Sequence, residues 1–85
     1  MRLKVKLCDM VTIKNLVLAA ERLPCDVDLQ SGSFVIDAKS ILGVLGLPEN
    51  DTGILQVHSD DPNICTPFLE ELEHLGILCP EGPMI

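Results

Sequence analysis

Apolar and positively charged residues alternate strictly over 2–7, which reads RLKVKL. Leu3, Val5 and Leu7 would share one face of an extended segment, with the charged side chains on the other face. A period of two is typical of a half-buried β-strand with one face in water. A similar alternation returns in three later segments, 25–29, 34–38 and 54–59. Four strand-like segments in one short chain constrain its fold more than any other feature.

A helical period separates the first of these segments from the second. Apolar residues from Ile13 to Leu23 recur at intervals of three and four, the spacing of one helical face. Thr12 is the expected N-cap, and Pro24 is the expected stop. The pattern therefore predicts a helix over 13–23, reached through a loop that includes Cys8 to Thr12.

A second long helix is predicted near the end of the chain. Asp61 and Pro62 resemble an N-cap followed by proline at the first helical position. Pro67 lacks an N–H one turn later, so we expect an irregular entrance and a regular helix over 66–75. Gly76 is the expected glycine just after the helix. The buried face is predicted to consist of Phe68, Leu72 and Leu75.

A short helix is predicted within Lys39–Leu47, which reads KSILGVLGL. Ser40 is a good N-cap, because its hydroxyl can accept a bond from a free backbone N–H. Gly46 and Pro48 end the helix. Its apolar residues are too many for one narrow stripe: Ile41, Leu42, Val44 and Leu45. We therefore expect some of them in the core and others in water, where an exposed apolar patch marks a partner site.

These segments follow one another in the order βαββαβα. Such an order predicts an α+β fold, an open-faced β-sandwich in which helices cover one face of a four-stranded antiparallel sheet. The chain has 85 residues, enough for one domain with a single modest core. We expect that domain over 1–78. Residues 79–85 contain two prolines and a glycine and are expected to fray.

The segment KSILGVLGL resembles the regulatory-serine segment of HPr, the small phosphocarrier of the bacterial sugar phosphotransferase system. In that family Lys-Ser-Ile opens the short second helix, and a glycine three residues after the serine matches Gly43. The resemblance runs without a gap from Asn15 to Leu47 and includes DVDL at 26–29. The HPr element order is the same βαββαβα. The resemblance implies a protein-binding role near Ser40 and regulation by its phosphorylation.

The phosphoryl-accepting motif of that family is missing. HPr carries its phosphoryl group on a His in a Gly-x-His-Ala-Arg-Pro context at the start of the first helix. The corresponding region here, Leu7–Lys14, contains no His, Arg or Pro. Asp9 also adds a negative charge where a phosphoryl dianion would need positive charge. The family's transfer reaction therefore maps onto no residue of this chain, and we expect no enzymatic activity.

His58 and His74 are the remaining candidates for a phosphoryl acceptor, and we interpret both as ordinary surface or capping residues. His74 is expected near a helix C-terminus, whose negative dipole end opposes a phosphoryl group. His58, Asp60 and Cys65 have no spacing typical of a metal site. The sequence predicts neither a metal nor a cofactor.

Charge and cysteine usage narrow the class of protein further. The net charge is −7, and residues 40–85 contain eight acids and no Lys or Arg, so nucleic-acid binding is not expected. The four cysteines lack disulfide or zinc spacing and are interpreted as free thiols: Cys8, Cys25, Cys65 and Cys79. No signal peptide or membrane-inserting run is recognisable. These features predict a cytoplasmic protein.

Together the observations predict an HPr-like regulatory module that binds proteins and is switched by phosphorylation at Ser40. The predicted partner surface is Ile41, Leu42 and Leu45, of which we expect at least one to belong to the core. Its partners would be phosphotransferase-system components or a regulator. Two alternatives stay open at this point, an active phosphocarrier with a relocated acceptor and a structural or oligomeric HPr-like unit.

Overall fold

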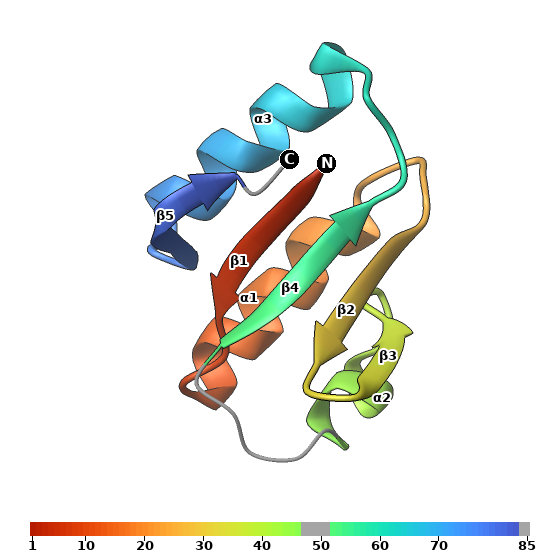
Figure 1. Cartoon of the computed structure of the whole chain (residues 1–85), viewed down its shortest axis with the longest axis vertical. Coiled ribbons are helices and arrows are strands. Elements are labelled where there is room, and N and C mark those ends of the chain that lie inside the picture. The colour runs from red at the N-terminus through yellow and green to blue at the C-terminus, as the bar shows by residue number, and fades with distance from the viewer. Residues whose placement is uncertain (47–51, 84–85) are drawn as a thin grey trace.

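A computed structural model of the protein describes residues 1–46 and 52–83, with side chains up to Cys79. The predicted helix stop at Pro48 lies outside the described residues. Figure 1 shows the course of the chain. In chain order the elements are β1 (Arg2–Lys6), α1 (Met10–Glu21), β2 (Val27–Ser31), β3 (Phe34–Asp37), α2 (Ile41–Leu45), β4 (Thr52–Val57), α3 (Pro62–His74) and β5 (Leu78–Pro83).

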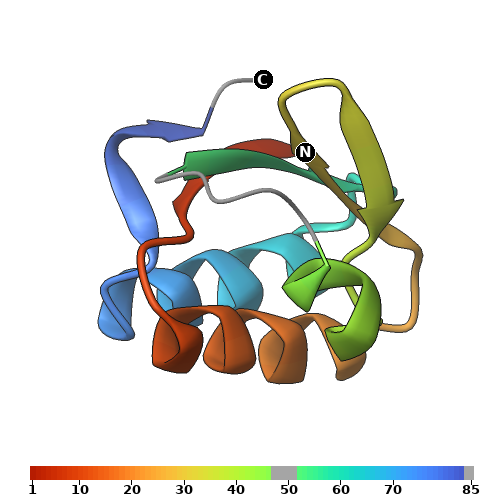
Figure 2. The same cartoon turned by 90° about the horizontal axis from the view of Figure 1, so that it is seen from below.

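The strands form one sheet in the order β3-β2-β4-β1-β5, and every neighbouring pair is antiparallel. Figure 2 shows the three helices on one face of this sheet, with the other face uncovered. The α+β class, the antiparallel sheet and its one-sided helical layer are therefore confirmed. The prediction of four strands is wrong, because the sheet has five.

Over 79–83 the fifth strand replaces the frayed tail that the sequence predicted, while 84–85 lie outside the described residues. Val5 of β1 pairs with Leu78. The Lys6 N–H also donates to the Ile77 carbonyl at 2.8 Å. Ile77 and Cys79 are buried, so leaving this segment in water would expose apolar surface. The sheet therefore continues past residue 78 to Pro83, within the described part of the chain.

The core lies between the sheet and the helices. The alternation of 2–7 places Leu3 and Val5 on the inner face, as predicted. The fully buried large side chains are Leu3, Val5, Leu16, Leu29, Leu55, Leu72 and Ile77, with Val17, Val27 and Val57 beside them. Phe68 is the one aromatic residue of this core, so packing is almost entirely aliphatic.

The two long helices begin earlier than predicted. In α1 the N-cap is Asp9 rather than Thr12: its Oδ1 accepts a bond from the Thr12 N–H at 2.7 Å, and the helix starts at Met10. In α3 the predicted Asp61 cap and the proline at the first helical position are confirmed. The helix is continuous from Pro62 and contains Pro67.

Three further expectations concern the buried face and the end of α3 and the strand boundaries. Phe68 and Leu72 are buried as predicted, but Leu75 is 41% exposed because it is the C-cap of α3 and lies past the last inward-facing turn. Gly76 has φ 73°, the left-handed conformation expected after a helix. The strands predicted over 25–29 and 54–59 are each displaced by two residues, to β2 and β4.

Candidate functional site

The short helix α2 begins at Ser40, as predicted. The Ser40 Oγ accepts a hydrogen bond from the Gly43 N–H at 3.3 Å. A turn leads into this cap: Asp37 Oδ1 accepts from the Lys39 N–H at 2.9 Å, and the Asp37 carbonyl accepts from the Ser40 N–H at 3.1 Å. The hydroxyl of Ser40 is therefore held at the edge of the molecule, directly after β3, on an exposed residue.

The three residues of the predicted partner surface, which we call the α2 patch, are Ile41, Leu42 and Leu45. Their exposed fractions are 37%, 82% and 42%. Val44, at 3%, is the residue of this helix that packs in the core. The expectation that at least one of the three belongs to the core is wrong, because a helix of five residues has room to point one side chain inward, and Val44 takes that place.

The helical layer exposes further apolar side chains outside the α2 patch. α1 lies beside α2 in the layer seen in Figure 2. Met10 and Val11 were expected in a loop, whereas both belong to the first turn of α1 and are exposed. Recognising Asp9 as a cap followed by an apolar helical turn would have found them. The other exposed apolar residues of the long helices are Leu18 and Leu75.

The charges around Ser40 differ from what its neighbours in sequence suggest. The Lys39 Nζ donates to the Leu23 carbonyl just after α1, at 2.8 Å. That ammonium therefore stabilises the end of α1 instead of lying over Ser40. Asp37, three residues before the cap, is itself acidic and would repel a negative charge added to Ser40. Stabilisation of such a charge would therefore come mainly from the backbone N–H groups at the start of α2.

The start of α1, where the sequence resemblance would place the phosphoryl site of HPr, contains a carboxylate. The backbone N–H of Thr12 donates to Asp9, and this bond lowers the pKa of the Asp9 carboxyl below its ordinary value. Asp9 is thus ionised at neutral pH and occupies the position where the helix N-terminus would favour an anion. The exposed Cys8 precedes it, with its thiol 3.8 Å from Asp9 Oδ2.

His58 does not lie near that position. His58 follows β4, and its Nε2 lies 2.7 Å from Asp28 Oδ2 on β2. Because Lys6 pairs with Thr52 and Arg2 with Gln56, His58 lies at the opposite end of the sheet from the loop after β1. His74 is in the last turn of α3, as predicted.

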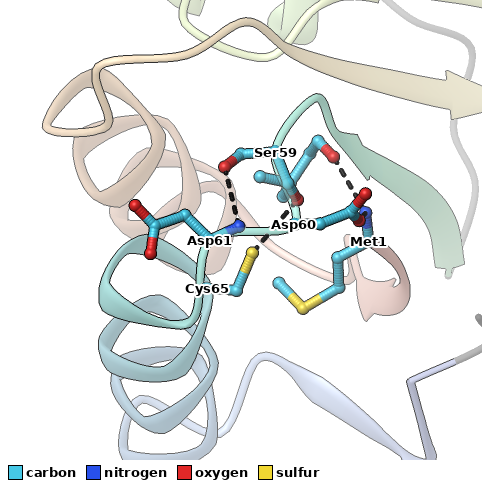
Figure 3. Close-up of polar contacts among 6 residues, drawn as sticks. Met1, Ser59, Asp60, Asp61 and Cys65 are labelled. Carbon is cyan, nitrogen blue, oxygen red and sulfur yellow. Dashed lines mark hydrogen bonds and ion pairs between the residues drawn. The ribbon is translucent and has the colours of Figure 1, made fainter.

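The residues considered as metal ligands do not converge. Figure 3 shows the loop between β4 and α3, where the Cys65 thiol donates to the Ser59 carbonyl at 3.2 Å. Asp60 instead lies beside the Met1 α-amino group, 3.9 Å from its nitrogen. In the described part of the chain no three His, Cys, Asp or Glu side chains form a cluster that could hold a metal ion. The four cysteines are free thiols, Cys65 and Cys79 being buried.

Comparison with known proteins adds no relative. No family model matches this chain, and no curated protein matches it either. Among its described residues, no helix has the length and apolarity needed to cross a bilayer. The site must therefore be interpreted from its own geometry and from the sequence resemblance.

Proposed function

We propose that this chain is an HPr-like regulatory module that binds a protein partner through the α2 patch and carries no phosphoryl group on His. Phosphorylation of Ser40 is the switch in this proposal. The partner would be a component or regulator of a bacterial sugar phosphotransferase system in the cytoplasm. The resemblance of KSILGVLGL to the HPr regulatory-serine segment supports this assignment, and the carboxylate of Asp9 at the start of α1 argues against transfer through His.

One observation supports the binding role above the others. All three residues of the α2 patch are exposed although the same short helix contributes Val44 to the core. Burying one large aliphatic side chain contributes about 1.5–3 kcal/mol, so the fold gains nothing from the apolar surface that these three residues leave in water. Adjacent exposed apolar side chains are typical of a surface that another protein covers.

The position of Ser40 supports a switch at that surface. A phosphoryl group adds about −1.5 to −2 charge and three acceptor oxygens at neutral pH. It would be attached in place of the hydroxyl proton to the Ser40 Oγ, which now accepts from the Gly43 N–H, at the rim of the patch beside Ile41. The Lys39 ammonium now donates to the Leu23 carbonyl, and this bond competes with any pairing of Lys39 with the new charge. An apolar partner would then have to desolvate a dianion, which opposes binding without any change of fold.

The test is labelling by HPr kinase with radioactive ATP. We expect label on the wild-type chain and none on Ser40→Asn, which keeps a good N-cap but offers no hydroxyl. Leu42→Asp should slow labelling about tenfold or more, since it removes the most exposed apolar contact. Val35→Asp places the same charge on an exposed apolar residue of β3 and should leave the rate unchanged.

Three outcomes would contradict the proposal. Absence of label on the wild-type chain, or equal label on Ser40→Asn, would exclude the switch. Equal rates for Leu42→Asp and Val35→Asp would exclude the patch as the docking surface. Thermal melting of both aspartate variants keeps the comparison valid, because substitutions at such exposed positions should change stability by no more than about 0.5 kcal/mol.

A further inference from the structure

The strand β3 forms one edge of the sheet, and within the described part of the chain no strand pairs with its outer side. Figure 1 shows β3 as the outermost strand on that side of the molecule, close to α2. In an antiparallel sheet, successive residues direct their N–H and carbonyl groups alternately to one side of the strand and to the other. The open side of an edge strand is therefore a template on which a further strand can pair.

One hydrogen bond fixes which residue of β3 directs its backbone groups outward. The Ala38 N–H donates to the Val27 carbonyl at 2.8 Å, which continues the ladder between β2 and β3 by one residue. Because the direction alternates, Ile36 and Phe34 also bond to β2, and Val35 between them directs its N–H and its carbonyl away from the sheet. Neither group of Val35 has a partner among the described residues.

The side chains of β3 are apolar where its backbone is open. Phe34 is 52% exposed and Val35 is 63% exposed, while Ile36 packs against the core. The strand reads FVID, without the Lys or Pro that protects many natural edges from pairing, and its one charge, Asp37, lies at its end. Open backbone groups beside exposed apolar side chains are the features of an edge to which another strand is added.

A second copy of β3 fits this edge in one register. Antiparallel pairing about a two-fold axis places one residue opposite itself, and only Val35 or Ile36 at that centre lets three residues of each strand pair. With Val35 at the centre, the two Val35 residues exchange reciprocal N–H to carbonyl bonds. Phe34 of each copy then lies opposite Ile36 of the other, and Asp37 lies opposite the neutral Ser33. Apolar side chains therefore meet apolar ones on both faces of the joined sheet.

The register centred on Ile36 is less favourable for backbone and for charge. It sets Val35 opposite Asp37 and needs the Asp37 carbonyl, which already accepts from the Ser40 N–H at 3.1 Å. It also brings the two Asp37 residues to about two positions apart, or roughly 7 Å along the strands. The register centred on Val35 separates them by roughly 14 Å, beyond the Debye length of about 8 Å at physiological salt. Hydrogen bonding, packing and charge therefore select the same pairing.

We propose that this chain forms a weak two-fold dimer in which the β3 strands of two copies pair antiparallel, Val35 opposite Val35, and join the two sheets into one. A single short strand pair belongs among the smallest interfaces, below about 1,200 Å², so the expected dissociation constant is about 0.1–1 mM. Kinase labelling at about 10 μM therefore measures the monomer. The dimer depends neither on Ser40 nor on binding through the α2 patch.

The test measures self-association of the full chain between about 10 μM and 1 mM, on either side of that constant. Sedimentation equilibrium gives the mass, and ¹⁵N spectra of the same samples locate the contact. We expect the mean mass to rise from monomer towards dimer, with amide shifts centred on Val35. Raising the salt should strengthen association, because it screens repulsion between two chains of net charge −7.

Three substitutions separate this strand pairing from non-specific association. Val35→Pro removes the outward N–H without removing a bond to β2, and edge strands tolerate proline at such positions. It should weaken dimerisation about tenfold or more, since both reciprocal bonds are lost. Val35→Asp should do the same, because it sets two like charges opposite each other. Leu18→Asp is the matched control: it places the same charge on an exposed apolar residue of α1, and it should change the dissociation constant less than about twofold.

Several results would overturn the proposal. These are a monomer mass up to the highest concentration, equal effects of Val35→Asp and Leu18→Asp, and amide shifts centred on the helices. A monomer mass together with binding of an added peptide SFVIDA would also overturn it, and would assign the edge to a strand of another protein. Thermal melting shows whether each variant is folded. If Val35→Pro is unfolded, Val35→Asp alone decides the comparison with Leu18→Asp.

Discussion

Gly53 provides a quantitative test of the packing between the sheet and the loop after β1. It lies in β4 opposite Val5 and is buried. A Cβ atom at this position would lie 2.8 Å from Leu7 Cδ1, 3.1 Å from Leu29 Cδ1 and 3.0 Å from the Gln30 carbonyl oxygen. Leu7 can move its side chain, but Leu29 is fully buried and the Gln30 oxygen belongs to the backbone of β2. Gly53→Ala therefore overpacks a site that cannot fully relax.

The expected loss of stability follows from two opposing terms. Overpacking a core costs about 1–3 kcal/mol. Replacing a strand glycine by alanine recovers about 0.5–1 kcal/mol of backbone entropy. The net loss of unfolding free energy is about 1–2 kcal/mol, which in a domain of this size lowers Tm by roughly 5–15 °C.

Thermal unfolding followed by circular dichroism measures this shift. Gly46→Ala is the matched control, because its added Cβ would come no closer than 3.4 Å to another atom and its φ of −81° suits alanine. We expect the control to change stability by no more than about 0.5 kcal/mol. If Gly53→Ala melts together with the wild type and the control, the close approach of Leu29 and β2 to Gly53 is wrong.

Three further predictions concern phosphoryl transfer, backbone conformation and the pH dependence of stability. Phosphoenolpyruvate with Enzyme I should not label the chain, and an acid-labile phosphohistidine at His58 or His74 would contradict this. Gly76→Ala should lower the unfolding free energy by about 1 kcal/mol in urea titrations because φ is 73° there, although the space is open. The pKa of Asp9 is lowered in the folded state, so its stabilising bond is present at neutral pH and lost as pH falls below about 4. Asp9→Asn should therefore make urea midpoints less pH-dependent in that acidic range, and an unchanged dependence would refute this cause.

Local chemistry allowed much of the secondary structure to be predicted. The Ser40 cap, the Asp61 cap with Pro62 behind it and the left-handed Gly76 each depend on bonds or clashes within a few residues. Strict alternation placed Leu3 and Val5 on the buried face for the same reason, since a strand's period of two does not depend on its neighbours.

The errors arose where a distant segment decided the outcome. The tail after Ile77 contains residues that favour turns, yet it forms β5 because β1 offers an open edge and the core has room for Cys79. The first turn of α1 was missed because Asp9 competes with Thr12 as a cap. Both are acceptable caps by sequence, and only the path of the chain after β1 selects between them.

The features of the candidate site likewise fall into those set by local sequence and those set by tertiary packing. The sequence by itself determined that Ser40 begins a short apolar helix, and that no His follows the first strand, because capping and residue identity are local properties. Only the tertiary structure decided that Val44 faces the core while Leu42 stays in water. It also brought Arg22 to Glu71 across 49 positions of sequence, which joins the end of α1 to α3. Exposure and long-range pairing depend on how elements pack, and the period of a helix too short for two full turns does not specify which side is covered.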